Sequence, residues 1–194
     1  MYIHPRQVLR KIKEWRMLHS FRIWLYKYRS HNHICGEYKA MQPVQAMGEG
    51  RIITKGTQFG YTPSPDFYSY SYLEARYRDA TIEIGASTIN NHFVCVAEHS
   101  TITIGDGCLI GANVEIINSN FHSLSVQKHH RGGTTSKPVV IENNVFIGNN
   151  VKIMKGVRVG YGAVIANNAV VFDNVAPEVI VRGNPAVFYA KINN

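Results

Sequence analysis

The sequence predicts an all-β protein whose body is a parallel β-helix. From residue 141 to residue 176 a six-residue pattern repeats six times, each repeat holding an aliphatic residue, a pair of turn-forming residues and a small or β-branched residue. A period of six fits neither an α-helix nor an open two-faced sheet. Short strands joined by Asn, Asp and Gly turns instead close a triangular coil, and stacked coils bury their aliphatic residues. The aliphatic positions are Ile141, Ile147, Ile153, Val159, Ile165 and Val171; the small or β-branched ones are Val145, Val151, Val157, Ala163, Ala169 and Val175; the turn pairs end at Asn144, Asn150, Gly156, Gly162, Asn168 and Asn174.

The same period continues toward the N-terminus, which extends the predicted β-helix. Cys108 belongs to an earlier coil, two residues before an aliphatic position. An ordinary sandwich would need irregular hairpin turns and strict period-two alternation, so we expect the β-helix to begin near residue 51. The earlier inward positions are Ile104, Ile110 and Ile116; Ile84 and Val96, each with an inward partner two residues before at Ile82 and Val94; and Ile53 and Phe59 in a first coil.

Three segments organise the chain. Residues 1–50 are expected to form a basic helix and a lead-in, residues 51–183 the β-helix, and residues 184–194 a closing segment. Two stretches interrupt the repeat, at 61–80 and 118–137. The first is rich in tyrosine, and the second is a polar extruded loop that carries His122, His129 and His130. Long insertions in solenoids tend to bind ligands or partners, so both stretches are candidates for function or subunit packing.

Composition narrows the cellular setting. The 194 residues contain no apolar run long enough to cross a bilayer, and the N-terminus lacks the apolar core of a secretory signal. Three cysteines at wide spacing do not suggest a disulfide framework, and Cys108 lies on an inward position where a free buried thiol is expected. We therefore expect a cytoplasmic protein.

Charge is concentrated at the N-terminus. Residues 1–30 hold eight Lys and Arg against Glu14, so they carry +7 of the net charge of +8. Apolar residues at helical spacing predict a helix over 6–30 that either packs on the body or rests on an anionic membrane. The body shows no basic face, which argues against nucleic acid as a partner. The apolar stripe is Val8, Ile12, Trp15, Leu18, Phe21, Leu25 and Tyr28.

Beyond the period, several motifs resemble the hexapeptide-repeat acyltransferases. The loop around His122 is one, and a Gly-Asn-Pro-Ala element at residues 183–186 is similar to the one that closes the repeat in maltose- and galactoside-type O-acetyltransferases. The resemblance implies a left-handed β-helix, a homotrimer and an acetyl-CoA site between neighbouring subunits. The further matches are Ile104-Gly105-Asp106, Lys137-Pro138-Val139 and Val145-Phe146-Ile147-Gly148.

His122 is the expected catalytic residue. Acetyl transfer to a sugar hydroxyl needs a base that removes the hydroxyl proton, and a neutral imidazole suits that role near pH 7. A direct transfer needs no nucleophilic Ser or Cys. We read His129 and His130 as solvated loop residues.

The resemblance also suggests binding residues. Asn91 and Glu98 match positions that face the acceptor in relatives, and Glu98 is also one candidate to orient His122. The family's common Lys for the CoA phosphates is replaced here by Asp173, so Arg182, Lys191 or Lys155 would have to supply that charge. The expected acetyl-CoA contacts are Phe146, Gly148, Asn149, Ala166, Asn167, Arg182 and Lys191.

Several alternatives stay open at this point. The expected acceptor is a sugar of a bacterial surface polysaccharide or lipopolysaccharide precursor, with a peripheral contact at the inner membrane face through the basic helix. The acceptor could instead be a nucleotide-linked amino sugar, which would make the reaction N-acetylation, or an antibiotic. A zinc enzyme of the γ-carbonic-anhydrase kind would need His92, His99 and His122 to converge, although we expect no metal. A non-catalytic β-helix scaffold is the remaining alternative.

Overall fold

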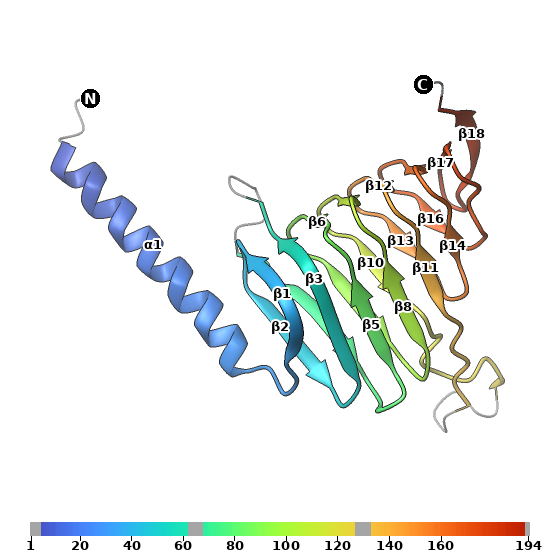
Figure 1. Ribbon diagram of the computed structural model, residues 1–194, viewed down its shortest axis with the longest axis horizontal. Helices are drawn as coiled ribbons and strands as arrows, with labels where there is room; N and C mark the ends of the chain where they lie inside the picture. Colours follow the sequence, from blue (N-terminus) through green and yellow to red (C-terminus); the bar gives the residue numbers. More distant parts are fainter. Residues whose placement is uncertain (1–4, 62–67, 127–132, 193–194) are drawn as a thin grey trace.

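A helix precedes a stack of strands that wind into coils (Figure 1). The computed structural model describes residues 5–61, 68–126 and 133–192, with side chains from Lys13 onward, so His129 and His130 lie outside the described residues. The elements are α1 (Pro5–Tyr28), β1 (Ile34–Ala40), β2 (Val44–Gly48), β3 (Arg51–Phe59), β4 (Ser71–Ala75), β5 (Thr81–Ile84), β6 (Thr88–Ile89), β7 (Val94–Ala97), β8 (Thr101–Ile104), β9 (Leu109–Ile110), β10 (Glu115–Ile117), β11 (Val139–Ile141), β12 (Phe146–Ile147), β13 (Lys152–Ile153), β14 (Arg158–Val159), β15 (Val164–Ile165), β16 (Val170–Val171), β17 (Val179–Arg182) and β18 (Val187–Lys191).

The strands form a three-sided parallel stack. The first face runs β14-β11-β8-β5 to the first half of β3, and the second half of β3 continues into the second face, β6-β9-β12-β15-β17. β1 pairs with both halves of β3. The third face runs β16-β13-β10-β7-β4-β2. We call the turn from the second face to the third the second corner, and the turn from the third face to the first the third corner. Only the C-terminal β18 is antiparallel to its neighbour, among the strands described.

The interior confirms the six-residue pattern. All twelve inward positions predicted between residues 141 and 175 are buried. Five of the six turn pairs end in a residue with positive φ, between 58° and 80°; the sixth, Asn174, instead accepts a hydrogen bond from the Arg158 amide at 2.7 Å. Cys108 is a buried free thiol, as expected, and burial raises its pKa.

Asparagine side chains link consecutive coils at the corners. At the second corner the Asn149 amide donates to Asn167 Oδ1 at 2.7 Å, and Asn149 Oδ1 accepts from the Ala112 amide at 2.7 Å. A Cβ on Gly148 would stand 2.4 Å from Asn167 Oδ1. These contacts require glycine and asparagine at the corner whether or not a ligand binds there.

Two strands are one residue out of the predicted phase. In β3 the buried residue is Ile52 and not Ile53; in β7 Cys95 and Ala97 are fully buried, the predicted Val94 is only half-buried, and the predicted Val96 is buried but keeps some exposure. β3 spans two faces and bends at Gly56, where φ is 87°, so its first half cannot be read by counting back in sixes. Local geometry overrides the repeat in these early coils.

The stack is longer than the sequence predicted. β1 pairs with β3 and β2 pairs with β4, so coils begin inside residues 1–50, which were expected to hold only the helix and a lead-in. β4 also lies within the expected insertion at 61–80, yet it pairs with β2 and β7 on the third face. Its outward Tyr72 and inward Leu73 explain the alternation seen in that stretch.

α1 lies beside the first coil and contacts β2 (Figure 1). Arg22 donates to the Ser69 carbonyl at 3.0 Å, and the rings of Tyr26 and Tyr70 lie 4.6 Å apart. Part of the predicted apolar stripe does not pack on the body, because Phe21 and Tyr28 are 51% and 76% exposed. Among the described residues, no helix is long and apolar enough to cross a membrane.

Candidate functional site

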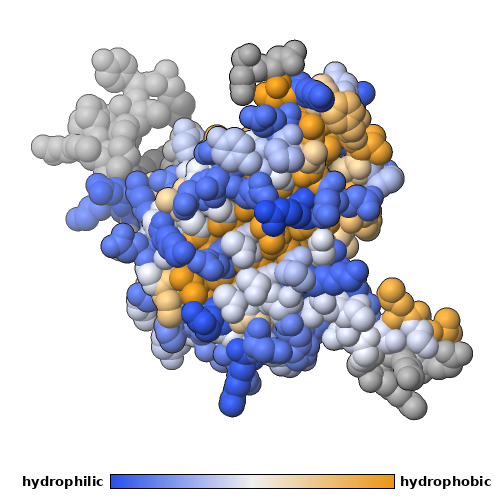
Figure 2. Space-filling model, turned by 45° about the vertical axis from the view of Figure 1, so that its right-hand side comes forward, coloured by the Kyte–Doolittle hydropathy of each residue, from blue (hydrophilic) through white to orange (hydrophobic). Residues whose placement is uncertain are grey.

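The extruded loop leaves the stack at the third corner, between β10 and β11, and its two ends are joined. Ser119 and Ser136 form an antiparallel bridge, and the Lys137 amide donates to the Asn118 carbonyl at 2.9 Å. Asn120 Oδ1 accepts from the Thr135 amide at 2.8 Å. Figure 2 shows apolar side chains on this loop, at the lower right beside the grey atoms. The loop therefore has a structured base.

His122 lies just beyond that base and is exposed. Its amide donates to the Asn120 carbonyl at 2.7 Å, and the Asn120 side-chain amide donates to the His122 carbonyl at 2.6 Å. Phe121 has a φ of 55°, a conformation that a bulky residue rarely adopts. This tight turn fixes the backbone of His122 while leaving its side chain at the surface.

A cluster of charged side chains around the buried Glu98 contacts this turn. The Glu98 carboxylate, in a residue only 2% exposed, accepts a hydrogen bond from the Ser119 hydroxyl and lies 3.6 Å from the Arg76 guanidinium. Ser119 Oγ in turn accepts from the Phe121 amide at 3.0 Å, and Arg76 lies 4.7 Å above the Phe121 ring. Glu98, expected to contact the acceptor or to orient His122, thus has its carboxylate bonded to Ser119 and close to Arg76 at the base of the loop.

Glu74 completes the cluster. Arg76 donates to both of its carboxylate oxygens, at 2.8 and 3.3 Å, and the Tyr72 hydroxyl donates to it at 2.9 Å. Burial acts to raise the pKa of Glu74, but the hydrogen bonds from Arg76 and Tyr72 outweigh it, and the pKa is lowered. The pKa of Tyr72 is raised to about 12, mainly by burial and secondly by its hydrogen bond to Glu74.

Sequence reasoning missed Arg76, Glu74 and Ser119. The signal was present in the coil register, because Ala75 pairs with Ala97 and places the next residues, Arg76 and Glu98, in adjacent coils. Finding it would have required β4 to be recognised as part of the stack.

A shallow cavity of about 220 Å³ lies on the second face near the second corner. Tyr61, Thr88, Leu109, Phe146 and Asn149 are among the residues that line it. Phe146 is 48% exposed, so its ring borders the cavity and not the core. Two residues predicted to contact acetyl-CoA therefore meet in one hollow.

The remaining predicted cofactor residues divide into two groups. Gly148, Ala166 and Asn167 follow consecutive strands of the second face at the second corner, and Arg182 ends β17 at the same edge. The Arg182 guanidinium stacks 3.8 Å over the ring of Tyr189. Lys191 pairs with Val179 at the opposite end of β17, so the structure does not bring it to this corner.

Asn91 lies at the second corner, while Glu98 and His122 lie at the third. Asn91 is buried, and its Oδ1 accepts from the Tyr61 amide at 2.9 Å. The strand β7 separates Asn91 from Glu98 within the chain. Of the two predicted acceptor contacts, Glu98 therefore lies at the same corner as His122 and Asn91 lies at a different one.

Of the three histidines that a zinc site would need, His92 lies apart from His99 and His122 within this chain. His92 follows Asn91 at the second corner, whereas His99 lies at the third, with Nδ1 3.1 Å from the Asp79 carboxylate. Within the part of the chain that the structure describes, no cluster of three or more His, Cys, Asp and Glu could hold a metal ion.

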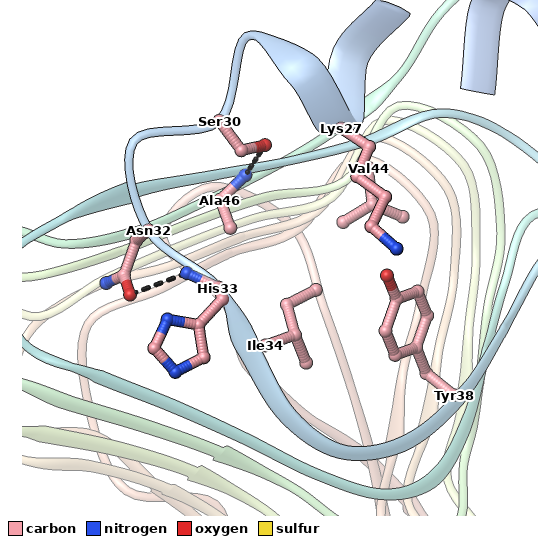
Figure 3. A pocket seen from close by; sticks show the side chains of 8 residues that line it. All are labelled: Lys27, Ser30, Asn32, His33, Ile34, Tyr38, Val44 and Ala46. Carbon is pink, nitrogen blue, oxygen red and sulfur yellow. Dashed lines mark hydrogen bonds between the residues drawn. The ribbon is translucent and has the colours of Figure 1, made fainter. Parts of the chain in front are cut away.

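A second hollow, of about 250 Å³, opens at the start of the stack (Figure 3). It lies between the end of α1 and the first coil, where Lys27, His33 and Tyr38 border it. Ser30 Oγ accepts from the Ala46 amide at 2.9 Å and holds the end of α1 to β2. This hollow lies at the N-terminal end of the stack, several coils away from the base of the extruded loop between β10 and β11.

Comparison with known proteins agrees with the repeat. Residues 138–173 match the family described as bacterial transferase hexapeptide (six repeats), and residues 101–119 match the hexapeptide repeat of succinyl-transferase. None of the curated proteins compared with the chain gives a match.

Solved structures share the fold. A hexapeptide-repeat-containing acetyltransferase from Vibrio cholerae, complexed with acetyl-coenzyme A, is 24% identical, with a TM-score of 0.50 over 83% of this chain and 72% of that one. The polySia-specific acetyltransferase NeuO is 23% identical, with a TM-score of 0.57 over 81% of each chain. AntD, an N-acyltransferase from Bacillus cereus in complex with dTDP and coenzyme A, is 13% identical, with a TM-score of 0.66 over 83% of each chain. The chain therefore carries the hexapeptide repeats of bacterial transferases and has the fold of the hexapeptide-repeat acetyltransferases.

Proposed function

We propose that this protein is an acetyl-CoA-dependent O-acetyltransferase that acts on a sugar hydroxyl of a bacterial surface polysaccharide or lipopolysaccharide precursor. The observation that carries the proposal is the structured base of the extruded loop at the third corner. A partly buried cluster of Glu74, Arg76, Glu98 and Ser119 holds a strained turn there, and that turn ends at an exposed histidine. A non-catalytic β-helix scaffold has no structural need for a strained turn held by charged residues where its repeat is interrupted.

His122 acts as the general base in the proposed reaction. Its neutral imidazole accepts the hydroxyl proton of the sugar as that oxygen attacks the thioester carbonyl of acetyl-CoA. The tetrahedral adduct then expels the CoA thiolate, which takes the proton from the imidazolium. The acetyl group passes directly to the sugar, and the histidine returns to its neutral form.

The Phe146 cavity is the proposed place for the pantetheine arm. Phe146 and Leu109 offer exposed apolar surface to it, and the coil corners beside it carry backbone amides and Asn side chains. Of the predicted phosphate contacts, Arg182 is at the right corner and Lys191 is not. We therefore retain Arg182 for that role and regard Lys191 as the weaker candidate.

The proposed assembly is a homotrimer of left-handed coils with sites between subunits. Phe146 and His122 lie on different sides of the third face, so one subunit alone does not bring the cavity to the base. In a three-fold ring, the second corner of one subunit can face the third corner of the next. The same arrangement would let Asn91 approach a site that contains the neighbour's His122.

Mixed trimers test the shared site. Phe146→Asp and His122→Ala would each inactivate the enzyme, but unfolding and refolding an equal mixture should restore about one quarter of the wild-type sites, because each mixed trimer then holds one intact pair. If both residues serve the same subunit's site, the mixture stays inactive. A mixture of each variant with itself is the control.

The reaction class is tested by thiol release from acetyl-CoA in the presence of a panel of sugars and amino sugars. We expect release that depends on an acceptor with a free hydroxyl and a product ester that hydroxylamine cleaves. A hydroxylamine-resistant amide would show N-acetylation instead. No release and no calorimetric binding of CoA would exclude the proposal.

A further inference from the structure

α1 presents an apolar stripe that the β-helix does not cover. Met17, Phe21, Trp24 and Tyr28 follow one another at spacings of four, three and four residues, which places them on one side of the helix. They are 69%, 51%, 57% and 76% exposed. Their rings touch along the helix, with Phe21 5.8 Å from Trp24 and Trp24 5.6 Å from Tyr28.

The opposite side of α1 is the one that holds it to the body. Arg22 and Tyr26 contact the 68–70 segment, and the Ser30 hydroxyl donates a hydrogen bond to the Tyr26 carbonyl at 2.9 Å. The stripe therefore faces away from the coils, and Figure 1 shows the helix standing clear of the stack on that side. Packing on the body accounts for one side of α1 only.

Basic side chains flank the stripe. Lys13 lies four residues before Met17 on the same side of the helix, whereas Lys27, three residues after Trp24, lies at the edge of that side, toward the hollow that it borders; both are exposed. Residues 1–30 carry a net charge of +7. Copies of this helix would repel each other at close range, so the stripe is poorly suited to a second copy and well suited to a negatively charged surface.

We propose that α1 docks on the surface of an anionic lipid bilayer. Trp24, Phe21 and Tyr28 would enter the boundary between headgroups and acyl chains, where aromatic rings are favoured, while the Lys and Arg side chains meet anionic headgroups. The helix lies along the surface and does not cross it. This inference concerns α1 alone and does not depend on the proposed acetyl transfer.

Vesicle co-sedimentation of the full chain tests the proposal without acetyl-CoA. We expect binding to vesicles with about one third phosphatidylglycerol, little binding to pure phosphatidylcholine, and release by high salt because the attraction is screened. Phe21→Ser with Trp24→Ser should weaken binding about tenfold or more. Equal binding to both kinds of vesicle, or no binding to either, would overturn the proposal.

Charge is tested by reversal with a matched control. Replacing Lys13, Arg16 and Lys27 by Glu should weaken vesicle binding about tenfold or more, whereas replacing the body residues Lys39, Arg51 and Arg78 by Glu, with the same change in net charge, should weaken it far less. Similar losses in the two triple variants would show that only overall charge matters and would overturn the assignment to α1. Circular dichroism confirms that each variant is folded.

Tryptophan fluorescence locates the contact, because the chain has only Trp15 and Trp24. With Trp15→Phe, the remaining Trp24 should shift its emission to the blue and be quenched by lipids brominated on their acyl chains. With Trp24→Phe, Trp15 should respond less, because it stacks on His19 at 5.4 Å, away from the stripe. Light scattering of Phe21→Ser/Trp24→Ser should give the wild-type mass; a smaller mass would mean that the stripe binds another copy and would overturn the proposal.

Discussion

The buried carboxylate of Glu98 accepts a hydrogen bond from the Ser119 hydroxyl, and Ser119 lies three residues before His122. The same Ser119 hydroxyl accepts a hydrogen bond from the Phe121 amide, so it connects a charged group in the coil to the strained turn. Loops that carry function are usually held by rigid elements beneath them, and here the support comes from two stacked coils.

Replacing Glu98 by Gln tests this support. The amide keeps the size of the side chain but removes the charge that faces Arg76, so we expect a loss of about 1–3 kcal/mol in the free energy of unfolding. If the turn positions His122, kcat should fall about tenfold while the KM for acetyl-CoA stays near wild type. Urea denaturation and steady-state kinetics measure both. Loss of stability with full kcat would show that the cluster supports only the fold.

Acid should selectively weaken the Glu74–Arg76 pair. The pKa of Glu74 is lowered in the folded protein, so its charge stabilises the fold above pH 4.5, its ordinary value, and this contribution disappears as the pH falls through the lowered pKa. The melting temperature of Glu74→Gln should be about 2–6 °C below wild type at pH 7, and the gap should close in acid.

Scanning calorimetry from pH 7 to pH 3 measures that gap. Glu49→Gln is the control, since its pair with Arg78 is largely exposed and should contribute little at any pH. If the difference in melting temperature between wild type and Glu74→Gln does not change with pH, the loss of stability comes from the altered packing of the side chain and not from its charge.

Phe146→Ala should weaken CoA binding more than it weakens the fold. The ring is half exposed over the cavity, so we expect the Kd for CoA to rise about tenfold with a stability loss of about 1 kcal/mol or less. Phe172→Ala is a matched control, since Phe172 is 53% exposed and does not line the cavity. Equal CoA affinity in the two variants would remove Phe146 from the binding site.

How far the sequence predicted the fold depended on the regularity of the repeat. Between Ile141 and Val175 every coil has the same length, so side-chain period alone identified the inward residues. Ile52 and Cys95 were missed because β3 bends across two faces and the adjacent coils have unequal lengths. β4 was missed because its inward Ser71 is polar, a choice that makes sense only once Gln42 is seen to donate to it at 2.6 Å.

The candidate site was predicted in part for the same reason. His122 and Phe146 stand out locally, one in a polar loop and one at an outward repeat position. The Arg76–Glu98–Ser119 cluster joins residues about one coil apart, and no local pattern marks it. The exposed stripe on α1 was also hidden, because an apolar stripe in sequence does not show which side of a helix meets the body.

The most direct test of the account is the rate of thiol release from acetyl-CoA by wild type and by His122→Ala, measured with a saturating sugar acceptor. Loss of a general base should lower kcat by about 100-fold or more while CoA binding, measured by calorimetry, is kept. His31→Ala, an exposed histidine at the start of the stack, should retain wild-type kcat. A His122→Ala enzyme with wild-type kcat would contradict the account and place the base elsewhere.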